Sequence, residues 1–126
     1  ELLRYTPLAT SVAPFSRIAV EDFEFGGELI RAGDAVVAQN DSANRDESVF
    51  ERPEEIDFTR LPNPHLAFGH GAHHCPAAPL ARLELNIAIG TLVRRLPGLR
   101  LAVPVDEVVW QSNRVMRGVK ELPVKW

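Results

Sequence analysis

The only cysteine of this chain ends a glycine- and histidine-rich loop, residues 65–75, just before the most regular apolar pattern in the sequence. From Leu80 to Leu96, leucine and isoleucine recur at helical spacing with polar residues between them, and Pro97-Gly98 follows. This pattern predicts one long helix that begins soon after the loop and stops at Pro97. Because the helix is so apolar, we expect it to be covered on more than one side.

Cys75 would then lie at the N-terminus of the long helix. Free backbone N–H groups and the positive end of the helix macrodipole favour a thiolate at such a position. A sulfur of this kind is suited to bind a metal or to act as a nucleophile. Gly69 and Gly71, just upstream, allow the loop to adopt positive φ or to approach a flat partner closely.

Taken alone, Cys75 has three readings. By base rate, a lone cysteine is most often a buried free thiol. A zinc site is a second reading, because four histidines lie nearby, but no second cysteine or spaced histidine pair completes a tetrahedral set. A Cys–His nucleophile is the third, although adjacency in sequence is weak evidence for a pair that must meet in space. The histidines are His65, His70, His73 and His74.

The other segments predict short elements. Residues 1–5 look like the end of a helix stopped by Pro7, and because Glu1 already lies inside that helix we expect the chain to be a fragment. Alternation over 17–25 before Gly26-Gly27 predicts a strand or hairpin, and residues 29–30 and 35–38 a second hairpin with a buried second strand. We expect a helical turn within 40–46, an irregular coil over 50–64, and strands over 99–103, 108–111 and 119–124.

Composition sets broad limits. The chain has 126 residues, 45% hydrophobic and 25% charged, as is typical of one soluble globular domain. A net charge of -3 gives no reason to expect nucleic acid or an anionic membrane as a partner. No apolar run approaches the roughly 20 residues of a membrane span. A single cysteine cannot form an internal disulfide.

Residues 68–75, Phe-Gly-His-Gly-Ala-His-His-Cys, followed by Leu-Ala-Arg-Leu-Glu at 80–84, resemble the haem-binding loop and helix of bacterial cytochromes P-450. The family pattern is Phe-x-x-Gly-x-His/Arg-x-Cys-x-Gly. The resemblance extends over the whole chain, through Glu1-x-x-Arg4, the coil over 43–60 and the closing segment 117–124. It implies an α+β fold class, with residues 1–126 forming the C-terminal haem-thiolate portion of one cytochrome P-450 domain.

The resemblance also implies roles for individual residues. Haem b would be the cofactor, and Cys75 would be the axial thiolate ligand of its iron, donating electron density that favours O–O cleavage. His73 and Arg17 would bind the haem propionates, and Phe68 would pack near the sulfur. The residues expected to bind the cofactor are Cys75, His73, Arg17, Phe68, Gly69 and Ala77; none is expected to be catalytic within this fragment.

Glu1 and Arg4, at i and i+3, can pair on one helix face. In the resembling family such a pair is structural: it anchors the coil and helps to shape the haem pocket. Its third partner is usually an arginine of the coil, but Glu55 occupies that place here. The sequence leaves the substitute open among Arg45, Arg52 and Arg60.

Two short segments would face the substrate, through Val12 and Ala13 and through Val115 and Met116. The sequence departs from the family pattern after the cysteine, where Pro76 lacks an N–H and Ala77 replaces glycine.

The resemblance implies a cytoplasmic bacterial monooxygenase that acts on a small organic molecule, with electrons passing from NAD(P)H through a ferredoxin-type donor. The oxygen-activating helix and most of the substrate pocket would precede Glu1, so we expect the fragment alone to be inactive. Two alternatives remain: a haem-free relative that activates a partner enzyme, and a non-functional truncated product.

Overall fold

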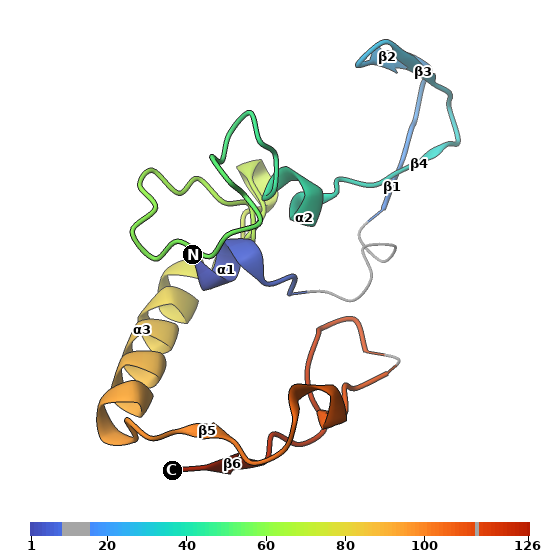
Figure 1. Cartoon of the computed structure of the whole chain (residues 1–126). Coiled ribbons are helices and arrows are strands. Elements are labelled where there is room, and N and C mark those ends of the chain that lie inside the picture. The colour runs from blue at the N-terminus through green and yellow to red at the C-terminus, as the bar shows by residue number, and fades with distance from the viewer. Residues whose placement is uncertain (9–15, 113) are drawn as a thin grey trace. The chain divides into compact units, whose positions relative to one another are not determined.

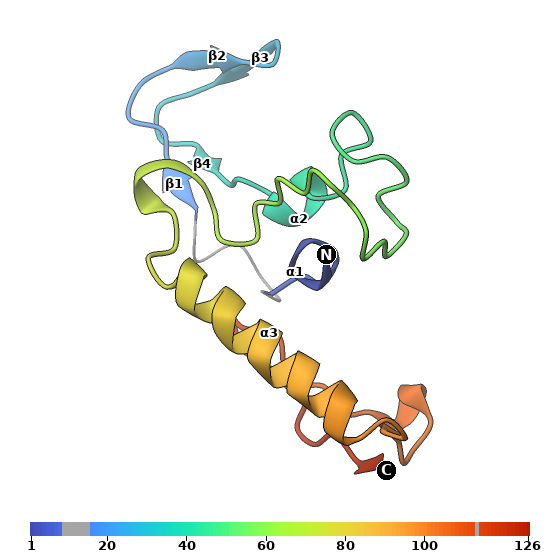
Figure 2. The ribbon, with the colours of Figure 1, turned by 90° about the vertical axis from the view of Figure 1, so that its left-hand side faces the viewer.

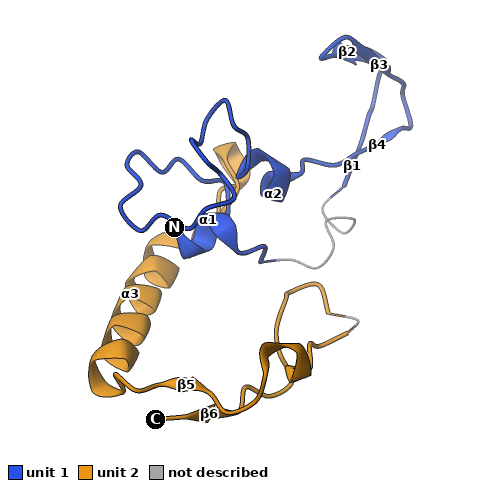
Figure 3. Cartoon of the chain, viewed as in Figure 1, with its two compact units in different colours: residues 1–67 blue, residues 68–126 orange. Residues whose placement is uncertain are grey.

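The computed structural model describes residues 1–8, 16–112 and 114–126. The chain divides into two compact units, residues 1–67 and residues 68–126 (Figure 3). Both units combine short helices or 3-10 turns with two-stranded antiparallel ladders. The expected α+β class is therefore confirmed. No helix of the described residues is both long and apolar enough to cross a bilayer.

The first unit begins with α1 (Leu2–Tyr5), a short helix that ends before Pro7 as expected. Later in the unit, α2 (Asn40–Ala43) provides the expected helical turn. After α2 the chain runs to residue 67 as turns and bends with no further helix or strand. The irregular coil expected over 50–64 is thus confirmed.

Four short strands of the first unit form one long hairpin (Figure 1). At its tip, β2 (Phe23–Phe25) pairs with β3 (Glu28–Ile30) around Gly26 and Gly27, whose φ values are 61° and 85°. At its base, β1 (Arg17–Ile18) pairs with β4 (Ala35–Val36). The prediction of a separate second hairpin with a buried strand was wrong. Residues 35–36 pair with β1 and not with residues 29–30, and Val37 is exposed.

The second unit is dominated by α3 (Ala78–Arg95), which follows the short 3-10 turn η2 (Gly71–His73), as Figure 2 shows. The predicted helix is confirmed, with a start two residues earlier than the apolar pattern indicated. After α3, β5 (Arg100–Leu101) pairs with β6 (Val124–Lys125), and η3 (Val105–Glu107) and a single Trp110–Val119 bridge lie between them. The strands expected at this end are therefore shorter than predicted.

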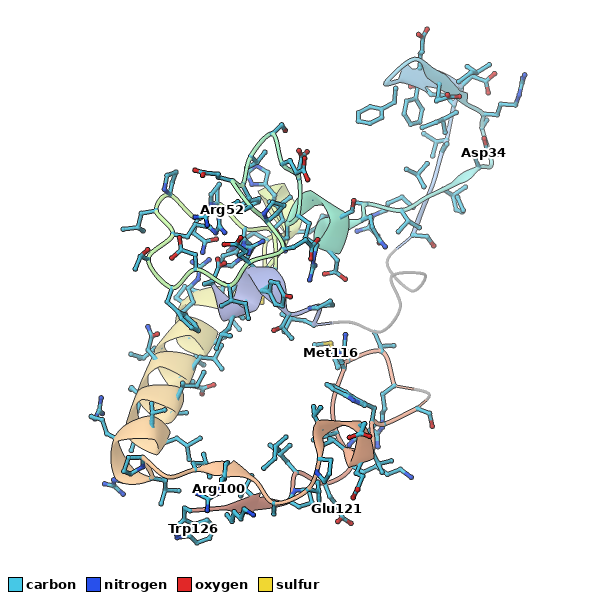
Figure 4. All side chains as sticks on the ribbon, viewed as in Figure 1. Asp34, Arg52, Arg100, Met116, Glu121 and Trp126 are labelled. Carbon is cyan, nitrogen blue, oxygen red and sulfur yellow. The ribbon has the colours of Figure 1, made fainter. Side chains whose placement is uncertain are left out.

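The buried residues of the first unit include two large polar side chains beside a few apolar ones. Arg4 and Asn44 are each 1% exposed, and Phe50 is 3% exposed. In the second unit, α3 buries only Ala78, while its leucines and isoleucines are exposed. Figure 4 shows side chains projecting from both sides of this helix. Within the described part of residues 68–126, α3 packs extensively against no other helix or strand. The expected cover of this helix is therefore not provided by its own unit.

Candidate functional site

The loop before α3 is closed by two backbone hydrogen bonds. The Cys75 N–H donates to the Phe68 carbonyl at 2.9 Å, so the two ends of the loop are joined. Inside it, the His74 N–H donates to the Gly71 carbonyl at 3.0 Å and closes η2. These bonds fix the backbone on which the cysteine is held.

Glycine is needed at two positions of this loop because the backbone turns left-handed there. Gly69 has φ 72° and Gly71 has φ 74°. A Cβ at Gly71 would meet nothing within 4 Å, and one at Gly69 would meet only the His73 carbonyl oxygen at 3.9 Å. Backbone conformation, and not crowding within the chain, is therefore the reason for glycine at both positions.

The start of α3 has few backbone donors, and some of them have no acceptor. Pro76 and Pro79 have no N–H, and the Ala78 N–H donates to the Cys75 carbonyl at 3.1 Å. Ala77 is the N-cap residue, and no side chain caps the helix. Among the described residues, the N–H groups of Ala77 and Leu80 have no recorded acceptor. The half-buried Cys75 thus precedes a helix start at which these two N–H groups have no acceptor among the described residues.

A contact that the sequence pattern did not reveal joins the loop to the helix. The Arg82 guanidinium lies over the Phe68 ring, 5.3 Å from its centroid. A cation in this position is attracted by the ring quadrupole. Since Phe68 also accepts the Cys75 N–H, the contact helps to hold both ends of the loop. The sequence shows an arginine in the first turns of the helix, but the residue spacing does not indicate that its partner is Phe68.

Five of the six residues expected to bind the cofactor lie on this one loop and the helix start. Phe68 and Gly69 are half-buried, whereas His73 and Ala77 are exposed. Arg17 lies in β1 of the first unit, with an exposed side chain whose Nη1 donates to the Ser16 carbonyl at 3.4 Å. The residues on the loop and helix start are Cys75, His73, Phe68, Gly69 and Ala77.

The zinc reading finds no support in the geometry. Across residues 1–8, 16–112 and 114–126, no three side chains of histidine, cysteine, aspartate or glutamate are placed to hold a metal ion together. The first interpretation, a buried free thiol, is met in part, because Cys75 is a free cysteine but is only partly buried.

A second polar cluster, formed around Arg4 in the first unit, uses all five guanidinium N–H groups. Nε and Nη2 donate to the two carboxylate oxygens of Glu1 at 2.9 and 2.7 Å. Nη1 donates to the carbonyls of Asn44 and Pro53, both at 2.8 Å, and Nη2 also donates to the carbonyl of Glu55 at 3.1 Å. One buried side chain thus fixes three points of the coil.

The Glu1 carboxylate is the anionic centre of this Arg4 cluster. Besides Arg4, it accepts from the Asp57 N–H at 3.1 Å, Arg60 Nε at 3.2 Å and Asn63 Nδ2 at 3.0 Å. The hydrogen bonds from Arg4 are the main cause that lowers the pKa of Glu1 from 4.5 to about 2, against the opposing effect of burial. Glu1 is therefore a carboxylate over the whole physiological pH range.

The arginine left open by the sequence is Arg60, whose side chain is 9% exposed and pairs with Glu1 at 3.2 Å. Arg45 instead donates to the Tyr5 carbonyl at 2.8 Å. Arg52 forms an exposed pair with Glu55 at 2.8 Å. The cluster binds Glu55 through its main-chain carbonyl only, which explains why a glutamate is tolerated there.

Of the four residues expected to face a substrate, Val12 and Ala13 lie outside the described residues. Val115 is 41% exposed and Met116 is 58% exposed. Figure 4 shows Met116 on the stretch that leads to the Trp110–Val119 bridge. Both residues are thus exposed, and their contact with a substrate stays a prediction.

Comparison with known proteins places this geometry in a family. The family model described as cytochrome P-450 matches residues 1–113. Over all 126 residues the chain is 55% identical to nocardicin C N-oxygenase of Nocardia uniformis subsp. tsuyamanensis, of which it covers 31%. It is 49% identical to mycinamicin IV hydroxylase/epoxidase of Micromonospora griseorubida, of which it covers 32%.

Solved structures give the same result. The crystal structure of the LnmA cytochrome P-450 hydroxylase from the leinamycin biosynthetic pathway of Streptomyces atroolivaceus matches with a TM-score of 0.90 and 54% identity. That match covers 99% of this chain and 32% of the hydroxylase. The chain therefore spans about a third of the length of the relatives that it matches.

Proposed function

The chain belongs to the cytochrome P-450 family, and we propose that it forms the C-terminal, haem-binding part of a bacterial monooxygenase that transfers an oxygen atom from O₂ to a small organic molecule. The observation that carries the proposal is the closed loop 68–75, which presents Cys75 at the start of α3 within a match that covers the whole chain. Relatives named as an N-oxygenase and as a hydroxylase/epoxidase support the reaction class.

The residues around Cys75 fit a haem-thiolate ligand. Cys75 is partly exposed, and among the residues that the structure describes the N–H groups of Ala77 and Leu80 have no acceptor. Donors of this kind stabilise negative charge on sulfur. When bound, haem b would supply the oxygen-activating chemistry. The role of this chain would be to hold the thiolate in a fixed orientation, on a loop whose backbone is already closed by hydrogen bonds.

The other loop residues would position the cofactor. Phe68, held under the Arg82 guanidinium, would pack beside the sulfur, and the backbone at Gly69 and Ala77 would approach the ring. His73 and Arg17 would donate to the propionates. Both side chains are exposed, and a carboxylate that is removed from water needs charge-assisted partners.

The Arg4 cluster would serve the cofactor only indirectly, as the anchor of the coil that precedes the loop. It ties α1 to main-chain carbonyls at Asn44, Pro53 and Glu55, and the Asn44 side chain in turn accepts the Leu66 N–H at 2.6 Å. Residue 66 lies two positions before Phe68, where the hydrogen-bonded part of the cysteine loop begins. The cluster thus fixes the chain almost up to the loop.

The finer parts of the proposal concern partners. Val12, Ala13, Val115 and Met116 would contact a substrate with apolar surface. Electrons would come from NAD(P)H through a ferredoxin-type donor, and the protein would act in the cytoplasm.

The ligand assignment is tested in the full-length protein by substituting Cys75→His. Reduced under carbon monoxide, the unsubstituted protein should show the red-shifted Soret band of thiolate ligation, and the variant should show the band position of histidine ligation. His70→Ala, an exposed substitution in the same loop, is the matched control and should keep the thiolate band. A thiolate band that persists in Cys75→His would refute the assignment. Absence of any haem from the unsubstituted protein would favour a haem-free accessory role.

The propionate contacts are tested by the double variant Arg17→Ala/His73→Ala. Each lost charge-assisted hydrogen bond should weaken haem retention by about 1.5–3 kcal/mol, measured as the rate of haem transfer to an excess of apomyoglobin. The double variant Arg31→Ala/His70→Ala removes an exposed arginine and an exposed histidine from the same segments and should leave the rate unchanged. Equal rates in the two double variants would exclude Arg17 and His73 from propionate binding.

A further inference from the structure

Two prolines stand within the four positions that follow Cys75, and they reduce the backbone donors available to its sulfur. Pro76 and Pro79 have no N–H, and the Ala78 N–H is taken by the Cys75 carbonyl at 3.1 Å. The donors left between 76 and 80 are those of Ala77 and Leu80. No N-cap side chain accepts from either donor, since the N-cap residue is an alanine.

Hydrogen bonds to a metal-bound thiolate withdraw charge from the sulfur and raise the reduction potential of the metal. A proline at the first position after the ligand removes one such donor and leaves the loop otherwise closed. From this we propose that Pro76 is a positioning residue that keeps charge on the Cys75 sulfur by withholding an N–H, and so holds the reduction potential of the bound haem low. This proposal rests on the proposed haem-thiolate function.

Pro76 can act in two ways that must be separated. Its ring fixes φ and could set the shape of the loop, and its missing N–H changes the hydrogen bonding of the sulfur. The loop has independent supports, because the Cys75 N–H, the His74 N–H and the Ala78 N–H each bond to a carbonyl within it or at its end. The shape of the loop therefore does not depend on the proline ring alone, so the effect of the missing donor can be measured separately.

The experiment compares two replacements at position 76 in the full-length haem-loaded protein. Pro76→Leu restores the N–H and removes the ring. Replacing Pro76 by leucic acid, the α-hydroxy analogue of leucine, also removes the ring but places an ester oxygen where the N–H would be. The reduction potential of each is measured by spectroelectrochemical titration without substrate.

Pro76→Leu should shift the ferric/ferrous equilibrium about three- to tenfold toward ferrous, a rise of about 30–60 mV at about 59 mV per decade. The leucic acid variant should stay at the potential of the unsubstituted protein. If both variants rise equally, or if neither rises, the proposal is wrong. Should Pro76→Leu not retain haem, Pro76→Ala restores the same N–H with less bulk and is measured in its place.

The carbon monoxide spectrum of the unsubstituted protein keeps this result distinct from the proposed function. A thiolate band together with unchanged potentials overturns the role of Pro76 and leaves the haem-thiolate function intact. Absence of the thiolate band overturns both.

Discussion

Replacing Glu1 by glutamine tests how much the Arg4 cluster contributes to stability. The substitution keeps the shape of the side chain and removes its negative charge. Arg4 and Arg60 would then remain as two cations, with side chains 0% and 9% exposed, around a neutral amide. Arg4 directs two of its five N–H groups at the carboxylate. The substitution would therefore remove the counter-charge of a fully buried guanidinium.

The lowered pKa of Glu1 gives the size of the expected loss of stability. Its fall from 4.5 to about 2 corresponds to about 3 kcal/mol of stability at pH 7, at about 1.4 kcal/mol per pKa unit. Breaking a buried ion pair from one side costs about 3–5 kcal/mol, which agrees. We therefore expect Glu1→Gln to lower the free energy of unfolding by about 3 kcal/mol at pH 7.

The pH dependence has a defined sign. A carboxyl whose pKa is lower in the folded state stabilises fully above its unfolded pKa of 4.5 and loses that contribution as the pH falls toward 2. About 2 kcal/mol of it should be gone at pH 3. The difference in stability between the unsubstituted protein and Glu1→Gln should therefore shrink by that amount between pH 7 and pH 3.

Urea unfolding of the full-length protein, followed by circular dichroism, measures these differences. Glu54→Gln is the matched control, since Glu54 also pairs with an arginine, Arg45 at 3.3 Å, but its side chain is 72% exposed. It should change stability by less than about 0.5 kcal/mol. Equal effects of the two substitutions at pH 7, or a Glu1→Gln difference that does not vary with pH, would refute the reasoning.

Two further substitutions test the backbone and the buried polar core. Asn44→Ala should cost about 1–3 kcal/mol in unfolding free energy, because the Leu66 N–H loses its acceptor at 2.6 Å; hydrogen exchange at the Leu66 amide should accelerate, and an unchanged exchange rate would contradict the assignment. Gly71→Ala should cost about 1–2 kcal/mol by thermal unfolding, since φ is 74° there. Gly98→Ala is its control, because φ is not left-handed at Gly98 and the added Cβ would make ordinary contact with Trp126 at 3.8 Å; equal costs at the two glycines would argue against strain.

The elements that the sequence predicts well are those with local signals. The apolar spacing of 80–96 and the Pro97-Gly98 stop define α3, and Gly26-Gly27 defines the turn of the β2–β3 hairpin. The left-handed backbone at two positions of the cysteine loop was also foreseeable, because both positions are glycines.

Contacts between distant segments were not predictable in this way. The pairing of β1 with β4 depends on a match between residues 17–18 and 35–36 that no local pattern marks. Arg60 could not be chosen over Arg45 and Arg52, since all three are arginines of one irregular coil and only the three-dimensional path places Arg60 at Glu1. Asn63 gave no signal at all, because an asparagine between two prolines is ordinary in a turn.

The wide sequence separation within the Arg4 cluster has a consequence for synthesis on the ribosome. The hydrogen bonds of the Arg4 side chain beyond Glu1 begin 40 residues downstream, and the hydrogen bond from Asn63 to Glu1 spans 62 residues. At about 5–20 residues per second, translation from Glu1 to Asn63 takes about 3–12 s. During that interval the Asn44, Pro53 and Glu55 carbonyls and the Asn63 side chain are not all available to Glu1 and Arg4. The coil can bury the Glu1–Arg4 pair only after it has been synthesised. The anchor therefore exists before the segment that it holds.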